Sequence, residues 1–195
     1  MKRVIYFAVA IVLLLVGYFV IKETSGQVST EAVKINSNLY MITSDDASVG
    51  KYEPISLSGL DNYELGTQIS YDYVGGIKES YPAQAEAKKV KVLNKKLTSY
   101  TADINSAMRI VRLLQTDVEF IDVREVDEFE ENHIEGAKNI PLGELEERAG
   151  DDIRKDVAVF LYCRSGNRSK TAQAILEDSG YFVIDMGGII DYKPE

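Results

Sequence analysis

The chain has 195 residues, 45% of them hydrophobic, which is enough for one packed domain and a smaller second unit. Its net charge is −9, and the excess lies in residues 97–195, which carry 11 basic and 21 acidic side chains. An acidic domain repels phosphate backbones, and the sequence has no basic face or aromatic platform, so nucleic acid is excluded as a partner.

The first segment, residues 1–22, predicts a membrane anchor. Met1-Lys2-Arg3 is a short positive head, and Val4 to Ile21 is an uncharged run of 18 residues. A helix of that length would be roughly 27 Å long, close to the thickness of a bilayer core. Thr24-Ser25-Gly26 is a marginal cleavage site, which favours an uncleaved signal anchor with the rest of the chain outside the cytoplasm. A cleaved signal peptide is the alternative.

The next two segments carry no recognisable motif. Residues 23–37 are rich in Ser, Thr, Lys and Glu without periodicity, which predicts a tether. Residues 38–96 hold several short β-like runs between turn signals, for example Ile69 to Val74 before Gly75-Gly76. Pro82 to Lys89 is compatible with a short helix. We expect a small β-rich unit packed on the following domain, and an extended stalk is the alternative.

Residues 97–195 predict an α/β domain. Asp103 is expected to cap a helix that runs to about Leu114. Further helices are expected between the strands, among them a short acidic helix around Val126 to Glu131. The expected strands are Val118–Val123, Ala137–Ile140, Val157–Tyr162 and Phe182–Asp185. Strands separated by helices imply a parallel sheet with helices on both faces. Ligands bind at the carboxyl ends of such strands, where Cys163 and Asp122 to Arg124 are expected to meet.

The stretch with the clearest chemistry joins the strand ending at Tyr162 to a helix expected over Lys170–Ser179. It consists of Cys163, Arg164, Ser165, Gly166, Asn167, Arg168 and Ser169. A sharp turn from strand to helix points successive N–H groups into one concavity, and the helix dipole adds positive charge there. Cys163, the only cysteine, is predicted at the mouth of this concavity, where those groups favour the thiolate. An inert buried cysteine beside a solvated turn is the alternative.

This loop resembles the active-site loop of the rhodanese sulfurtransferases, which commonly reads Cys-x-x-Gly-x-Arg. Other motifs of that family occur in order: Asp122-Val123-Arg124-Glu125, Glu128-Phe129, His133 to Ala137, Asn139-Ile140-Pro141 and Gly187-Gly188-Ile189. The resemblance covers about residue 97 to the C-terminus. The departures are Asn132 in place of a frequent Gly, Glu135 in place of Pro and Tyr192 in place of Trp, and none of them affects the nucleophile.

The resemblance implies a sulfurtransferase, and the anchor predicted at residues 1–22 would attach it to a membrane. Its Cys163 takes sulfur from a small anionic donor such as thiosulfate, holds it as a persulfide and passes it to a thiol or to cyanide. Arg164 and Arg168 are assigned to anion binding. The amides of the donor site are assigned to Ser165, Gly166, Asn167 and Ser169, and supporting roles are assigned to Asp122 and Arg124. His133 is expected to be structural, and neither a metal nor a cofactor is expected.

Two other interpretations stay open. A cysteine phosphatase also places a thiolate in such a loop, but usually with five residues between Cys and Arg. Here Arg164 to Asn167 are four, and no aspartate stands out as a general acid. The second interpretation is a membrane-tethered binding or sensing module that keeps the fold without turnover.

Overall fold

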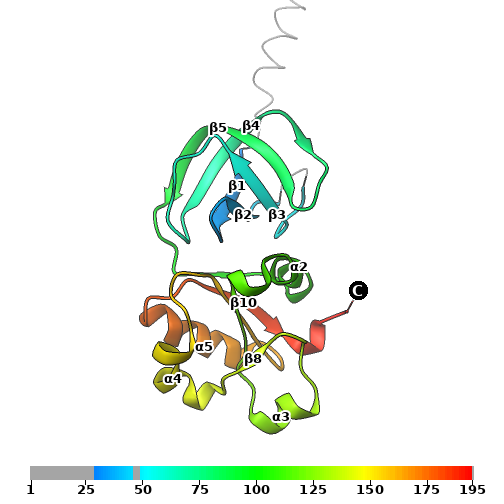
Figure 1. Cartoon of the computed structure of the whole chain (residues 1–195), viewed down its shortest axis with the longest axis vertical. Coiled ribbons are helices and arrows are strands. Elements are labelled where there is room, and N and C mark those ends of the chain that lie inside the picture. The colour runs from blue at the N-terminus through cyan, green and yellow to red at the C-terminus, as the bar shows by residue number, and fades with distance from the viewer. Residues whose placement is uncertain (1–28, 46–48, 195) are drawn as a thin grey trace, which may run out of the picture.

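The computed structural model describes residues 29–45 and 49–194. These residues form two units that are stacked along the long axis of the molecule, a closed barrel of strands and an α/β domain (Figure 1). The anchor predicted at Val4 to Ile21 lies outside the described residues. Within residues 29–45 and 49–194, no helix combines the length and the apolar character needed to cross a bilayer.

Five strands close the barrel in the order β1-β2-β3-β5-β4. They are β1 (Thr30–Lys34), β2 (Leu39–Ile42), β3 (Pro54–Ser58), β4 (Gln68–Lys78) and β5 (Ala83–Asn94). Neighbouring strands are antiparallel except β3 and β5, which are parallel. The β-rich segment is therefore a closed barrel.

The tether predicted over residues 23–37 has to be corrected, because β1 lies within it. Ala32 faces the interior of the barrel, whereas Val33 faces the α/β domain. Lys34 is also buried, and its ammonium group donates to Asn62 Oδ1 at 3.2 Å and to the carbonyl oxygen of Tyr63. A strand buried on both faces shows no alternation of polar and apolar residues, which is why the sequence pattern resembled a linker.

The short helix considered for Pro82 to Lys89 is also wrong, because Ala83 to Lys89 belong to β5. Ala83, Ala85 and Ala87 are buried, and the residues between them are exposed. Alternation with a period of two is the pattern of a strand with one buried face. Alanine has a high helix propensity, but here its small side chain fills the interior of a narrow barrel, so tertiary packing overrides the propensity.

The α/β domain contains a five-stranded parallel sheet in the order β6-β10-β9-β7-β8. The strands are β6 (Ser99–Thr101), β7 (Glu119–Asp122), β8 (Lys138–Asn139), β9 (Val159–Cys163) and β10 (Val183–Gly188). The helices are α2 (Ile104–Leu114), α3 (Val126–Glu131), α4 (Leu145–Asp152) and α5 (Asn167–Asp178), and three 3₁₀ turns are η1 (Gln115–Asp117), η2 (Leu142–Glu144) and η3 (Ile189–Asp191). The predicted parallel sheet with helices is confirmed.

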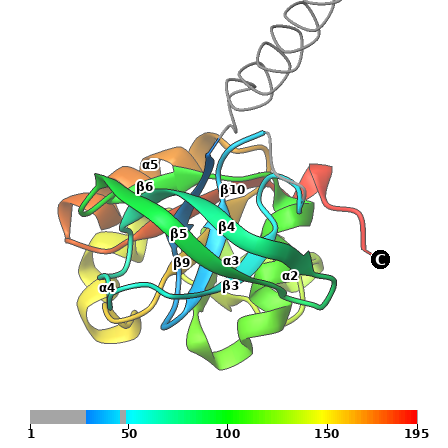
Figure 2. The same cartoon turned by 90° about the horizontal axis from the view of Figure 1, so that it is seen from above.

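The two faces of the sheet pack against different partners. Helices α4 and α5 cover one face, in a core that includes Leu161, Ala172 and Leu176. Helix α2 covers the other face, and its core continues into the barrel through Val33 of β1 and Met41 of β2. In Figure 1, α2 lies between the barrel and the sheet, and in Figure 2 the strands β3, β4 and β5 lie over the α/β domain. The barrel is therefore a packed unit and not an extended stalk.

Polar contacts reinforce this joint core. Arg109 of α2 forms an ion pair with Glu53, which precedes β3. The hydroxyl of Tyr100 donates to the carbonyl oxygen of Thr43 at 3.4 Å, and its ring meets that of Tyr52 edge to face with centroids 6.3 Å apart. These contacts fix the barrel on the side of the sheet opposite α4 and α5.

Candidate active site

Cys163 is the last residue of β9, the central strand of the sheet, and α5 begins four residues later. The turn is possible because Gly166 adopts a left-handed backbone with φ +93°, which glycine tolerates without strain. In this conformation the N–H of Gly166 donates to Cys163 Sγ at 3.1 Å. The sulfur thus accepts a hydrogen bond from a main-chain amide at the N-terminus of a helix, where negative charge is stabilised.

The position of the sulfur differs from the prediction in one respect. Cys163 was expected at the mouth of an open concavity, but it is only 1% exposed and packs with Leu161 and Ala172. The reason is that β9 is the middle strand and α5 folds back over its end. The thiol is therefore covered by its own loop and contacts both a donor amide and apolar side chains.

The loop residues divide into exposed and buried sets. Arg164, Ser165 and Asn167 are exposed, whereas Gly166 and Ser169 are buried. Ser169 Oγ donates to the carbonyl oxygens of Gly166 at 3.0 Å and of Gly187 at 3.4 Å, so this hydroxyl ties the loop to β10. The Arg164 guanidinium has no hydrogen-bond or ion-pair partner in the part of the chain that the structure describes. It is the loop cation available to a ligand.

Arg168, the other loop cation, is already paired. Its Nη2 donates to Glu128 Oε1 at 2.8 Å and its Nη1 donates to Glu128 Oε2 at 2.5 Å. These hydrogen bonds lower the pKa of Glu128 from 4.5 to about 2. They also raise the pKa of Arg168, and attraction to Cys163 adds to that rise. Both arginines are predicted to bind the anion. Among the described residues Arg164 has no partner, whereas the charge of Arg168 is neutralised by a carboxylate on α3.

Asp122 and Arg124 form a buried ion pair at the end of β7. Arg124 Nε lies 2.9 Å from Asp122 Oδ2 and its Nη2 lies 2.7 Å from the same oxygen, while the Arg124 amide donates to Oδ1 at 2.9 Å. Arg124 also donates to the carbonyl oxygen of Asn132. Asn139 on β8 donates to the carbonyl oxygens of both residues of the pair. All of these contacts are internal, so the pair stiffens the loop after β7.

The contacts that His133 makes with other described residues are local. Its Nδ1 donates to the carbonyl oxygen of Phe129 at 2.9 Å, and its ring stacks on the Phe129 ring with centroids 3.9 Å apart. The next amide, that of Ile134, donates to the hydroxyl of the buried Tyr162 at 3.1 Å. Across residues 29–45 and 49–194, no three His, Cys, Asp or Glu side chains are grouped so that they could hold a metal ion.

Two functional features were missed from the sequence. Glu128 was noted as part of a motif, but its pairing with Arg168 joins residues 40 positions apart and has no local signal. Asp185 was expected only to end a strand. It is 1% exposed, its Oδ1 accepts the N–H of Gly187 at 2.9 Å, and its Oδ2 has no hydrogen-bond partner among the described residues. The sequence signal that could have identified Asp185 is its position as a polar residue within an apolar strand.

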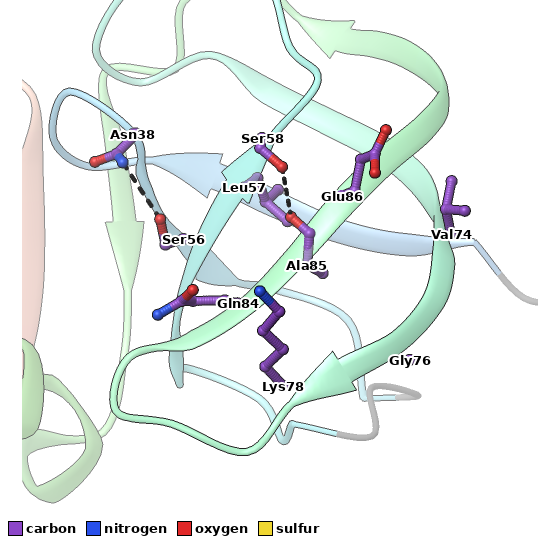
Figure 3. A pocket seen from close by; sticks show the side chains of 10 residues that line it. All are labelled: Asn38, Ser56, Leu57, Ser58, Val74, Gly76, Lys78, Gln84, Ala85 and Glu86. Carbon is purple, nitrogen blue, oxygen red and sulfur yellow. Dashed lines mark hydrogen bonds between the residues drawn. The ribbon is translucent and has the colours of Figure 1, made fainter.

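The barrel offers a separate polar groove of about 270 Å³, drawn in Figure 3. Part of its wall is fixed by hydrogen bonds from Asn38 Nδ2 to Ser56 Oγ at 3.3 Å and from Ser58 Oγ to the carbonyl oxygen of Ala85 at 3.4 Å. Its lining contains one lysine and one glutamate, and neither cysteine nor histidine. Thiol chemistry therefore belongs to the Cys163 loop alone.

Comparison with known proteins agrees with this geometry. Residues 106–192 match the rhodanese-like domain family, and residues 13–94, which include the barrel, match a family described as proteins of unknown function (DUF3221). The thiosulfate sulfurtransferase PspE of Escherichia coli is 39% identical over 74 residues, which cover 37% of this chain and 71% of PspE. The chain belongs to the rhodanese-like family.

Further relatives match the rhodanese-like domain only in part. The uncharacterized protein YqhL of Bacillus subtilis is 48% identical over 62 residues, which cover 32% of this chain and 48% of YqhL. The solved structure of a rhodanese with anions from E. coli is 38% identical, covers 40% of this chain and 94% of its own, and gives a TM-score of 0.37. The match thus spans about half the length of YqhL.

Proposed function

We propose that the chain is a rhodanese-type sulfurtransferase that moves a sulfane sulfur from a donor such as thiosulfate to a thiol or to cyanide. The observation that carries this proposal is the hydrogen bond of 3.1 Å from the Gly166 amide to Cys163 Sγ at the start of α5. An amide donor and a helix N-terminus favour a charged sulfur, and the thiolate is the nucleophile in thiol chemistry. The relative PspE is a thiosulfate sulfurtransferase, which supports the same reaction here.

The reaction has two displacements. The Cys163 thiolate attacks the outer sulfur of thiosulfate, a new sulfur–sulfur bond forms, and the old one breaks with its electron pair leaving on sulfite. The protein then holds a persulfide anion. Cyanide or a thiolate attacks the terminal sulfur, and the electron pair of the broken bond returns to Cys163. The scheme starts from the thiolate and therefore contains no general base.

The other loop groups have defined parts in this scheme. Arg164 is exposed and lacks a partner among the described residues, so it is the side chain assigned to the donor anion. The exposed Ser165 and Asn167 flank the entry, and Gly166 supplies an amide. Arg168, Ser169, Asp122 and Arg124 hold the loop in shape. A cysteine phosphatase fits this site less well. The Arg168 guanidinium, which would bind the phosphate, already forms an ion pair with Glu128.

The test is sulfur loading of the purified chain. Given thiosulfate or a low-molecular-weight persulfide, the protein is expected to gain the mass of one sulfur atom and to return it to cyanide as thiocyanate. Cys163→Ser is expected to do neither. A folded wild-type protein that takes sulfur from neither donor would instead support a non-catalytic binding or sensing module, and hydrolysis of an aryl phosphate would support the phosphatase.

We also propose that the chain is a single-pass membrane protein with its α/β domain outside the cytoplasm. The support is the uncharged run from Val4 to Ile21 behind a basic head. Because Cys163 is 1% exposed, thiol labelling is a poor reporter of topology. Protease added to intact cells is expected to remove a tag at the C-terminus while sparing a cytoplasmic control protein. Protection of the tag would contradict this orientation.

A further inference from the structure

The two arginines of the Cys163 loop differ in one respect that bears on the choice of substrate. The Arg164 side chain has no partner within the described residues, whereas Arg168 forms two hydrogen bonds with the Glu128 carboxylate. The Glu128–Arg168 pair has no net charge. We propose that Glu128 makes this site selective for sulfur donors of low negative charge, such as an alkyl persulfide, over dianions such as thiosulfate. This inference rests on the proposed sulfurtransferase function.

Arg168 connects the Glu128 carboxylate to the loop that carries the reacting sulfur. Arg168 lies in the first turn of α5, five residues after Cys163, on the helix whose N-cap residue Gly166 donates to Cys163 Sγ. Glu128 accepts from both Nη atoms of the Arg168 guanidinium and also accepts the amide N–H of Glu125 at 3.2 Å. It is therefore held in place by two elements, α3 and α5. A donor that approaches Cys163 therefore experiences the negative charge of Glu128 together with the positive charge of Arg168.

The negative charge of α3 and of the whole α/β domain also disfavours a dianionic donor. Helix α3 carries Asp127, Glu128, Glu130 and Glu131 and no basic residue. Within residues 97–195, acidic side chains outnumber basic ones by 21 to 11. The field of such a surface opposes the approach of an anion in proportion to the charge on the anion. A dianion is opposed about twice as strongly as a monoanion at the same distance.

The groups that remain for the donor suit a single negative charge. They are the N-terminus of α5 and the Arg164 guanidinium, because the Gly166 amide already donates to Cys163 Sγ. With an alkyl persulfide, the Cys163 thiolate attacks the terminal sulfur, and the electron pair of the donor's sulfur–sulfur bond leaves on an alkyl thiolate. The proton stays on the transferred sulfur, and only one negative charge has to be accommodated in the leaving group. With thiosulfate, the leaving sulfite carries two negative charges.

The test compares two donors on the same protein. Second-order rate constants for sulfur loading of the full chain are measured by mass spectrometry, with thiosulfate and with the persulfide of 2-mercaptoethanol. The wild type is expected to load faster from the persulfide. Glu128→Gln keeps an oxygen that accepts from Arg168 but loses the charge. It is expected to raise the rate constant for thiosulfate, relative to that for the persulfide, by about fivefold.

A matched control removes the same charge elsewhere. Glu119 accepts from Arg154 Nε at 2.7 Å at the start of β7, the end of the sheet away from the Cys163 loop. Glu119→Gln is expected to leave the donor ratio unchanged. Arg164→Gln is expected to move the ratio in the opposite direction to Glu128→Gln, because it removes the free cation. Partial misfolding of a variant lowers both rate constants equally, so the ratio still reports on charge.

Two results would overturn the inference while leaving the sulfurtransferase intact. One is a wild type that loads faster from thiosulfate than from the persulfide. The other is a donor ratio in Glu128→Gln equal to that of the wild type, which would make Glu128 a purely structural partner of Arg168. Failure of the wild type to load from either donor is a different outcome, and it would overturn the proposed function and this inference together.

Discussion

Gly188 lies directly against Arg164. A methyl group placed on the Gly188 Cα would stand 2.5 Å from the carbonyl oxygen of Arg164 and 2.6 Å from the Cα of Ser165. Both are backbone atoms, so they cannot move aside as a flexible side chain would. Gly188 is also the β10 residue in register with Cys163. The shape of the sulfur site therefore depends on the absence of a side chain on the neighbouring strand.

Gly188→Ala is expected to displace the loop and to slow sulfur loading at least about tenfold, with a loss of stability of about 1–3 kcal/mol, because the backbone must shift to admit the methyl group. Loading kinetics and urea unfolding measure the two effects. Gly143→Ala is the control, since a methyl group there meets nothing within 4 Å. Equal behaviour of the two variants would contradict the contact.

The buried pair of Asp122 and Arg124 is expected to matter more for stability than an exposed pair. Asp122→Ala leaves a guanidinium buried without its carboxylate, which costs about 3–5 kcal/mol. Glu119→Ala breaks the more exposed pair with Arg154 and is expected to cost at most about 1 kcal/mol. Urea unfolding at neutral pH compares the two. A cost for Asp122→Ala as small as that for Glu119→Ala would show that the pair is not stabilising.

Acid is expected to weaken the link between α3 and α5. The hydrogen bonds with Arg168 lower the pKa of Glu128 from 4.5 to about 2, so the folded state binds this proton less readily than the unfolded state. The stabilisation is complete above pH 4.5 and is lost as the pH falls toward 2. The difference in unfolding free energy between wild type and Glu128→Gln is therefore expected to be constant from pH 7 to 5 and to shrink below pH 4.5. A difference independent of pH would contradict the pairing.

The barrel and the α/β domain are expected to unfold together, because Met41 of β2 is fully buried in the core that contains α2. Met41→Ala is expected to destabilise the protein by about 2–5 kcal/mol. The helical signal in circular dichroism reports on the α/β domain, since the barrel is built of strands. That signal is expected to shift to lower urea concentration in Met41→Ala. An unshifted helical transition would show that the two units unfold independently.

Local signals in the sequence were sufficient to predict much of the secondary structure of the α/β domain. The acidic helix predicted at Val126–Glu131 has the same bounds in the structure, and Asp103 caps α2 by accepting the amide N–H of Ser106 at 3.0 Å. Both features depend on residues a few positions apart. The edge strand β6 was not predicted, because three residues are too few to show a period.

Features that depend on residues far apart in the sequence could not be predicted. β1 and the alanine-rich start of β5 take their conformation from the closure of the barrel, which pairs residues as distant along the chain as Thr30 and Tyr71. The loop with Cys163 was identified because its residues are contiguous. The partner of Arg168 was not, because Glu128 lies on another helix and only the fold brings the two together.

The covered position of Cys163 has a consequence for oxidative damage. The chain has no second cysteine, so an oxidised Cys163 cannot be recovered by forming an intramolecular disulfide. Cys163 is only 1% exposed, so an oxidant has to reach the sulfur by the same route as the sulfur donor. Repair of this protein then depends on reductants supplied by other molecules.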